Sequence, residues 1–481
     1  MAVAKEPTGG PVLGDLSTYA MDGHLILGLN EEGGAEVLSL ALANRHGLIT
    51  GATGTGKTVT LQVLAEAFSS AGVPVFAADI KGDLSGIAAL GTPKPPLAKR
   101  VEEIGLEGWG PQSFPTVFWD VFGEQGHPVR ATVQDMGPLV ISRLLELSEA
   151  QEGVMNIAFR WAADQRSEGG KRMRELHLID LDDLRAVLAT LSERAAEIRT
   201  EYGNVAPASV GAIQRRLLVL EEQGANNFFG EPALDISDFL RVADDGRGVV
   251  NILAADKLFH TPKLYSTFLL WMLTTLYEHL PEVGDLPKPK LVFFFDEAHL
   301  LFDGAPKALL DKIEQVTRLI RSKGVGVYYV TQNPRDVPDR VSAQLGNRIQ
   351  HALRAFTPQE QRGIRAAAET FRPNPKLDTE QVIKELKTGE ALISTLRGKG
   401  EPSIVQRTLL RPPMARIGPL TPNERNAIIS SSPFNGKYGQ RTERRSAHDV
   451  LDKEAGTVGG VMADLKDTLE AITSKVFGRR R

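Results

Sequence analysis

The chain of 481 residues contains no cysteine, which excludes disulfides, thiolate metal sites and cysteine nucleophiles. It also lacks an apolar run long enough to span a bilayer, because the most apolar stretch, Leu291–Phe302, is interrupted by charged residues. Residues 1–30 show no basic start followed by a long apolar segment, so no signal peptide is expected. These absences predict a cytoplasmic protein that does not enter a membrane.

An excess of positive charge is absent as well. The formal net charge is -4 and the isoelectric point is near 6.2, so any nucleic-acid-binding surface must be local, such as a channel. The remaining composition, 42% hydrophobic and 24% charged, is that of an ordinary globular protein. A chain of this length predicts two or three folding units or one elaborated α/β core.

A glycine-rich loop is the most informative motif. Residues 51–58 read GATGTGKT, which matches G-x-x-x-x-G-K-[ST]. The glycines let successive backbone N–H groups point at phosphate oxygens, Lys57 adds a positive charge, and Thr58 offers a hydroxyl to Mg²⁺. We therefore predict nucleotide contacts from Gly51, Ala52, Thr53, Gly54, Thr55, Gly56, Lys57, Thr58 and Val59.

The context of this loop favours a phosphate site over a chance glycine-rich turn. An apolar strand at His46–Thr50 leads into it, helical spacing runs from Lys57 to about Ala71, and Val73–Ile80 follows as a buried strand. Strand, helix and strand in so short a span form a βαβ unit, which implies a parallel sheet. The predicted fold class is therefore α/β, with the largely parallel central sheet of a P-loop NTPase.

A second motif supplies carboxylates. Leu291–Phe295 is an apolar strand that ends in Asp296 and Glu297, the Walker B pattern. Ligands of open α/β sheets bind at the carboxyl ends of strands, where these acids are expected to lie. Asp296 is predicted to hold Mg²⁺ together with Thr58, and Glu297 to orient and polarise the attacking water. No guanine-reading motif is apparent, which favours ATP as the nucleotide.

Polar residues after later strands complete the candidate site. Gln332 ends the apolar strand Gly326–Thr331 and is predicted to sense the γ-phosphate or the lytic water, the alternative being a turn-capping amide before Pro334. Arg348 is our first choice for an arginine acting on a neighbouring subunit's nucleotide. The other arginines considered are Arg321, Arg335, Arg340 and Arg354. Residues 79–83, with Asp79, Lys81 and Asp83, fit either a polar turn or a phosphate contact.

The pattern along the chain suggests four parts. Residues 1–45 read as a small region of strands and turns, and residues 46–90 with 246–410 as the ATPase core. Residues 91–245 read as a mostly helical insertion, and residues 411–481 as an extended strap followed by an amphipathic tail with a basic end. Further elements are expected at Gly248–Ala254 (strand), 263–280 and 306–323 (helices), Ile349–Phe356 (strand), 358–369 (helix) and 389–411 (hairpin).

Three motifs together resemble the HerA/FtsK branch of P-loop ATPases. They are the phosphate loop, FFFDEAH at 293–299 and VTQNP at 330–334. The chain is most similar to the bacterial YjgR-type group, through the stretch at 108–133, and the likeness covers residues 11–435. This resemblance implies a RecA-like ATPase core, hexameric rings with ATP between subunits, and movement of double-stranded DNA. Residues 411–413 are similar to a strap that reaches a neighbouring subunit in that branch.

The chain also departs from that branch. Only about 50 residues precede the phosphate loop, so the N-terminal β-barrel of HerA is reduced, and the long helical insertion has no counterpart that aligns. Three functions follow from the residues. The first is a ring-forming DNA translocase or helicase-like motor. The second is an ATP-dependent switch or assembly factor that acts on a protein partner through the insertion. The third, a non-hydrolysing scaffold, is disfavoured by Lys57 and Glu297.

Overall fold

The computed structural model describes residues 20–92, 94–106, 108–164, 176–303, 307–355, 357–442 and 444–453. They divide into two compact units. The first unit comprises residues up to His127 together with Asp235–Asn435, and the second comprises Pro128–Leu234 together with the described residues from Gly436 onward. The predicted amphipathic tail beyond residue 453 lies outside the described residues.

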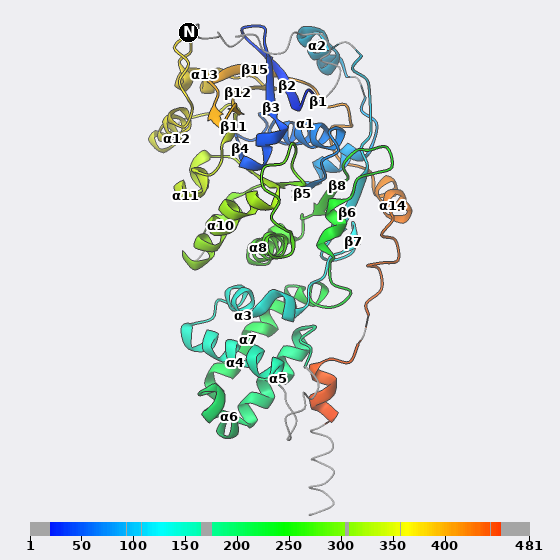
Figure 1. Ribbon diagram of the computed structural model, residues 1–481, viewed down its shortest axis with the longest axis vertical. Helices are drawn as coiled ribbons and strands as arrows, with labels where there is room; N and C mark the ends of the chain where they lie inside the picture. Colours follow the sequence, from blue (N-terminus) through cyan, green and yellow to red (C-terminus); the bar gives the residue numbers. More distant parts are fainter. Residues whose placement is uncertain are drawn as a thin grey trace, which may run out of the picture. The chain divides into compact units, whose positions relative to one another are not determined.

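The first unit is built on a mixed sheet whose centre is parallel (Figure 1). Its parallel strands are, in order across the sheet, β11 (Asn347–Gln350), β4 (Gly47–Thr50), β10 (Val325–Thr331), β9 (Leu291–Phe295), β5 (Val75–Asp79), β8 (Val250–Ala254) and β6 (Thr116–Asp120). Strand β4, which precedes the phosphate loop, therefore lies between β11 and β10. Only β10 separates it from β9, the strand that ends in the acids. This arrangement confirms the predicted α/β class with a largely parallel central sheet.

Antiparallel strands extend the sheet beyond β11. They are, in order, β12 (Glu390–Ser394), β15 (Gln406–Leu410) and β2 (His24–Asn30), which pairs with both β1 (Ala20–Met21) and β3 (Ala35–Ser39). Strands β12 and β15 confirm the predicted hairpin. Its tip carries a separate small sheet of β13 (Leu396–Arg397) and β14 (Glu401–Pro402).

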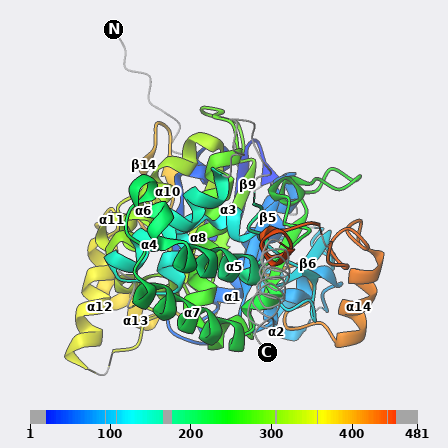
Figure 2. The ribbon, with the colours of Figure 1, turned by 90° about the horizontal axis from the view of Figure 1, so that it is seen from below.

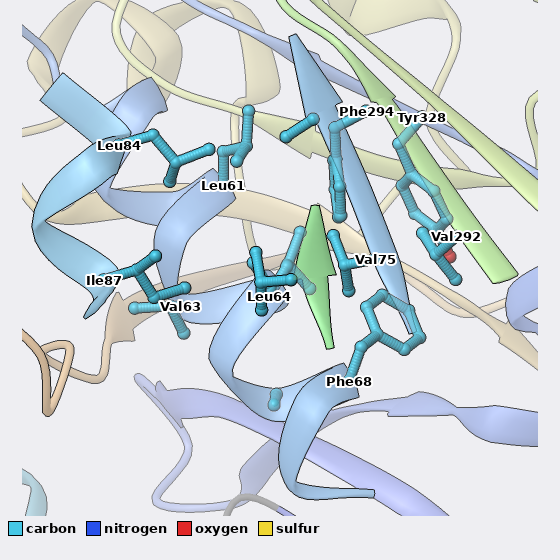
Figure 3. Close-up of a cluster of buried hydrophobic side chains, with 14 of the residues drawn as sticks. Leu61, Val63, Leu64, Phe68, Val75, Leu84, Ile87, Val292, Phe294 and Tyr328 are labelled. Atoms are coloured by element: carbon cyan, nitrogen blue, oxygen red, sulfur yellow. The ribbon is translucent and has the colours of Figure 1, made fainter. Parts of the chain in front are cut away.

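Helices cover both faces of the parallel strands. Successive side chains of β9 point to opposite faces of the sheet and all five are apolar, so both faces must be covered. On one face, Val292 and Phe294 pack with Tyr328 against α1 (Lys57–Ser70), as Figure 3 shows. On the other face, Phe293 stacks on Phe76 with ring centroids 4.4 Å apart. The α8 (Pro262–His279) and α10 (Lys307–Ile320) helices also lie on that side. Five apolar residues in succession are therefore buried because neither face of β9 meets solvent.

The first unit contains further helical elements. They are α2 (Pro95–Ile104), α9 (His299–Phe302), α11 (Asp339–Ser342), α12 (Pro358–Glu369), α13 (Thr379–Glu385) and α14 (Pro422–Ser431), with the 3₁₀ turns η1 (Leu40–Arg45), η2 (Asp83–Ala88), η4 (Ile236–Leu240), η5 (Leu258–His260), η6 (Arg321–Lys323) and η7 (Pro334–Asp336). Of these, η1 and η2 add Leu40, Ala43, Leu84 and Ile87 to this core. Helices α12 and α13 pack together beside the antiparallel strands (Figures 1 and 2). The helices predicted at 263–280, 306–323 and 358–369 correspond to α8, α10 with η6, and α12.

The segment after β15 is fixed to the P-loop helix. Glu66 of α1 is fully buried, and its carboxylate accepts the backbone N–H groups of Met414 at 2.8 Å and Ala415 at 3.1 Å. Gly86 leaves no room for a side chain, because the carbonyls of residues 416 and 418 pass over it. The predicted strap is thus extended where it crosses α1, but it ends in α14, which a proline at the first helical position begins.

The second unit is helical. It contains α3 (Val133–Leu144), α4 (Glu149–Ala163), α5 (Leu181–Glu193), α6 (Ala195–Tyr202), α7 (Pro207–Glu222) and η3 (Ala225–Asn227), and β7 (His127–Pro128) stands at its boundary in the chain. Helix α4 packs against α3, α5 and α7. The insertion is narrower than the predicted 91–245, since α2 and β6 belong to the first unit. Residues 91–115 contain many prolines and glycines and read as a loop. The sequence therefore gave no indication that the next segment, β6, belongs to the sheet.

Across the described ranges, no helix combines the length and apolar character that a membrane crossing requires.

A buried histidine predicts how stability depends on pH. His46 is buried, has φ 61°, and its Nδ1 accepts the N–H of Val327 at 3.0 Å. Burial lowers the pKa of His46 to about 4, below the value of about 6.5 in an unfolded chain. Protonation therefore favours unfolding as pH falls from about 6.5 to about 4, and one such residue costs about 2 kcal/mol of stability by about pH 5.

We expect His46→Asn to reduce the loss of stability between about pH 7.5 and about pH 5 by that amount, because asparagine tolerates positive φ and does not titrate there. Denaturant unfolding at both pH values measures it. His351 is also buried, with its pKa lowered to about 4. It should contribute equally to the pH dependence of stability in the wild type and in the variant. An unchanged pH dependence in the variant would show that His46 is not the titrating group.

Candidate nucleotide site

The phosphate loop joins the end of β4 to the start of α1. Gly51, Gly54 and Gly56 have φ of 156°, 78° and 114°, and the last two lie in the left-handed region that favours glycine. A side chain at Gly51 is excluded on a second ground, because its Cβ would lie 2.5 Å from the Cβ of His351. The glycines of the motif are therefore required by the backbone path. This path leads directly into the N-terminus of a helix of 14 residues, where backbone N–H groups are available to an anion.

Lys57 folds back across the loop. Its Nζ donates to the carbonyl oxygens of Gly51 at 2.6 Å and Ala52 at 3.1 Å. Burial lowers the pKa of Lys57, while the carboxylates of Glu297 and Asp296 act in the opposite direction. The ammonium group therefore lies between the loop and the acids that end β9. Thr58 and Val59 occupy the first turn of α1 behind it.

The acids occupy the turn after β9. Asp296 is buried, and burial together with the nearby Glu297 raises its pKa to about 6. Its Oδ1 accepts the backbone N–H of Glu297 at 3.0 Å, and its carbonyl accepts the hydroxyl of Tyr265 at 3.2 Å. Glu297 has φ 49°, a left-handed conformation that is uncommon outside glycine. The turn thus fixes the two carboxylates in different directions.

Polar side chains from three strand ends meet at Glu297. Its Oε1 lies 3.1 Å from Lys81 Nζ, and its Oε2 lies 3.4 Å from His299 Nδ1. The Gln332 amide donates to Oε2 at 3.5 Å and accepts the hydroxyl of Thr53 at 3.4 Å through its Oε1. Gln332 therefore connects the phosphate loop to Glu297.

Arg348 lies apart from this group. It is paired with Leu48 along β11, below the carboxyl end of the sheet, and its guanidinium donates to the carbonyl of Ser342 at 2.8 Å and to its hydroxyl at 3.2 Å. Burial lowers its pKa. Within one chain it does not reach the phosphate loop, so a role for Arg348 requires a neighbouring subunit.

The structure adds His351, which the sequence did not indicate, and places Asp79, for which the sequence left a polar turn and a phosphate contact open. His351, directly after β11, is buried beneath Gly51, and its Nε2 lies 2.9 Å from the hydroxyl of Thr60. Its low pKa keeps it neutral. Asp79 ends β5, and burial with repulsion from Asp296 raises its pKa to about 7. The only signal for His351 was its place directly after a strand, next to Gln350.

A divalent cation fits the donor set at these strand ends. Among the described residues, no cluster of three or more protein ligands could hold a metal by itself. Mg²⁺ needs only one or two protein oxygens when a nucleotide supplies the others. The hydroxyl of Thr58 and the carboxylate of Asp296 are such oxygens. Burial, with repulsion of Asp79 by Asp296 and of Asp296 by Glu297, raises the pKa of Asp79 and Asp296, and a cation beside these carboxylates would offset that repulsion.

Solved structures similar to the chain include a bacterial conjugative coupling protein and VirB4. The unbound monoclinic form of the bacterial conjugative coupling protein TrwB is 16% identical, with a TM-score of 0.49, over 80% of this chain and 89% of that chain. VirB4 of Thermoanaerobacter pseudethanolicus is 13% identical, with a TM-score of 0.49, over 82% and 98%. TrwB with a non-hydrolysable ATP analogue is 17% identical, with a TM-score of 0.48, over 79% and 92%.

The search of curated proteins found no match. The family model described as helicase HerA-like C-terminal matches residues 25–473, which is nearly the whole chain and includes the phosphate loop, β9 with its acids, and Gln332. The chain therefore belongs to the HerA-like helicase C-terminal family and is an ATPase of the P-loop class.

Proposed function

We propose that the protein binds Mg-ATP through residues 51–59, hydrolyses it with Glu297, and uses the cycle to drive a ring-forming motor on double-stranded DNA. One observation carries the ATPase part of this proposal. The contacts from Thr53 to Gln332 and from Gln332 to Glu297 connect the loop that would hold the phosphates to the carboxylate that would act on water. A γ-phosphate in the loop would lie beside both.

Each residue has a separate task in this proposal. Lys57 exchanges its bonds to loop carbonyls for bonds to the β- and γ-phosphates. Thr58 and Asp296 hold Mg²⁺, which neutralises charge on the phosphates when it is bound. Glu297 accepts a hydrogen bond from water and aligns it with the γ-phosphorus. Gln332 donates from the opposite side, so that the water has one orientation.

The motor part of the proposal rests on the family, since HerA-like helicases give the family its description. Its test is the Mg-ATPase rate of the full chain with and without duplex DNA. We expect duplex DNA to raise the rate and the binding to weaken steeply as salt increases. ATP turnover without stimulation, and without salt-sensitive DNA binding, would leave the ATPase standing and reject the DNA motor.

A protein-directed switch is the second candidate. The observation that favours it is the separate helical unit of residues 128–234, which adds a surface outside the ATPase core. In this case, a partner protein should copurify with the chain when Mg-ATP is present and be released when ADP replaces it. Partner release together with a DNA-independent ATPase rate would favour the switch over the motor.

Arg348 offers a test of shared sites in a ring, for which we propose a hexamer. We expect Arg348→Ala to lower the steady-state ATPase rate about 10-fold. The effect is modest because the guanidinium must give up its bonds to Ser342, and a net hydrogen bond to a charged group is worth about 1.5 kcal/mol. Mixing Arg348→Ala with Lys57→Ala should restore part of the rate, because some interfaces then combine an intact loop with an intact arginine. No recovery on mixing would remove the assignment to a neighbouring subunit's site.

A further inference from the structure

Lys81 contacts the catalytic carboxylate from a neighbouring strand. It lies two residues beyond the end of β5, which pairs with β9, and its Nζ lies 3.1 Å from Glu297 Oε1. The Lys81 side chain is 48% exposed, whereas that of Glu297 is 7% exposed. An ammonium group on a flexible, half-exposed stem is therefore held by a buried partner. Lysine is suited to such a role because its stem has several rotatable bonds.

This contact competes with the work that Glu297 would do. A carboxylate that aligns water must accept a hydrogen bond from that water. In the structure Lys81 occupies Oε1, while Gln332 and His299 lie against Oε2. Of these three neighbours, Lys81 makes the shortest contact, at 3.1 Å, and it is an ammonium cation. It is therefore the donor that most reduces the capacity of Glu297 to engage water.

ATP would offer Lys81 a stronger partner. The γ-phosphate would lie between the loop and Glu297, because the Thr53–Gln332–Glu297 contacts span that space. Its terminal oxygens carry more charge than one carboxylate and accept charge-assisted hydrogen bonds. Lys81 also has room to move, since its exposed side borders a cavity of about 360 Å³ shared with Asp79 and Arg425. ADP lacks the γ-phosphate and would leave the Lys81–Glu297 pair intact.

We propose that Lys81 is a positioning residue that distinguishes ATP from ADP. It pairs with Glu297 when no γ-phosphate is present, and it transfers to the γ-phosphate of bound ATP, which frees Glu297 to align water. This inference rests on the proposed ATPase function and identifies how the same site would sense the triphosphate. It also accounts for a lysine at a strand end that has no place among the loop and Walker B residues.

Equilibrium binding of two probes tests the transfer: Mg²⁺ with the β,γ-imido analogue of ATP, and Mg²⁺ with ADP. We expect Lys81→Met to weaken the analogue about 10-fold, the loss of about one charge-assisted hydrogen bond, and to change ADP affinity less than about twofold. Lys81→Arg should recover most of the discrimination because it keeps the charge. Lys257→Met is the matched control, since Lys257 is 49% exposed and pairs with Glu124 at 2.5 Å away from the loop. It should change neither affinity.

A double variant separates transfer from simple attraction. Glutamine at position 297 does not hold Lys81 by charge, so Glu297→Gln should bind the analogue several-fold more tightly than the wild type. That gain should disappear when Lys81→Met is added. If the gain persists without Lys81, Glu297 acts on the phosphate directly and the transfer is rejected. Equal losses of ADP and analogue affinity in Lys81→Met would also reject it, whereas a wild type that binds neither probe would reject the ATPase function itself.

Discussion

A Glu297→Gln variant is expected to bind Mg-ATP at least as tightly as the wild type and to hydrolyse it about 1,000-fold more slowly. Glutamine has the size of glutamate and can still accept a hydrogen bond, but it cannot take a proton from water or polarise it with a full charge. The left-handed backbone at this position, φ 49°, is equally accessible to both residues. The fold and the loop should therefore be unchanged while the chemical step is lost.

Single-turnover hydrolysis, measured beside equilibrium binding of ATP, distinguishes this outcome from general damage. Glu282→Gln provides a control, because the Glu282 side chain is 71% exposed and contacts Lys323 at 4.0 Å and the Ser322 hydroxyl at 3.4 Å, away from the phosphate loop. It should retain full activity. If Glu297→Gln hydrolysed ATP at the wild-type rate, another group would have to align the water and Glu297 would be reassigned to structure.

Local patterns in the sequence were sufficient to recognise the phosphate loop and the strand that ends in the acid pair. The run from β4 through the glycine loop to α1 is continuous in the chain, and so is the strand that ends in Asp296 and Glu297. Gly51, Gly54 and Gly56 are dictated by backbone geometry, so they remain recognisable without a structure. The family they indicated is confirmed by the match over residues 25–473. The roles of the individual side chains stay predictions.

Contacts between distant segments could not be predicted in the same way. Lys81 and Glu297 are 216 positions apart, and only the pairing of β5 with β9 brings them together. His351 reaches Gly51 because β11 and β4 run parallel in register, which no spacing reveals. The sequence interpretation also extended the helical insertion too far, because β6 follows a proline-rich stretch and joins an edge of the sheet. The Lys81–Glu297 contact, the His351–Gly51 contact and the start of the helical unit all depend on the order of strands in the sheet, which sequence motifs do not reveal.

Sheet order also explains why the site residues come from so many segments. The carboxyl ends of parallel strands lie along one edge, so the turns after β4, β5, β9, β10 and β11 converge there. Each turn supplies a different group: the loop amides, Lys81, the acid pair, Gln332 and His351. Removing any one group should therefore affect a distinct step, which is why substitutions at Lys57 and Glu297 are expected to have different signatures.

Lys57→Ala is expected to abolish most nucleotide binding and to lower kcat/KM for ATP about 1,000-fold. The Nζ of Lys57 makes two hydrogen bonds, to Gly51 O at 2.6 Å and Ala52 O at 3.1 Å, and both can be exchanged for phosphate oxygens. Two hydrogen bonds to a charged group are together worth about 4 kcal/mol. Unlike Glu297→Gln, this variant should lose affinity for both ATP and ADP, because the β-phosphate is common to them.

Lys288→Ala is a matched control for this change. The Lys288 ammonium also donates to two backbone carbonyls, Ala71 O at 2.8 Å and Gly72 O at 3.2 Å, but these lie at the opposite end of α1 from the phosphate loop. Both variants lose two hydrogen bonds to backbone carbonyls beside one end of α1, so a purely structural effect would weaken them alike. Calorimetric titration with Mg-ATP should show wild-type affinity for Lys288→Ala and almost none for Lys57→Ala. If Lys57→Ala bound ATP as the wild type does, the loop would not hold the phosphates, and the site proposed for ATP would have to lie elsewhere.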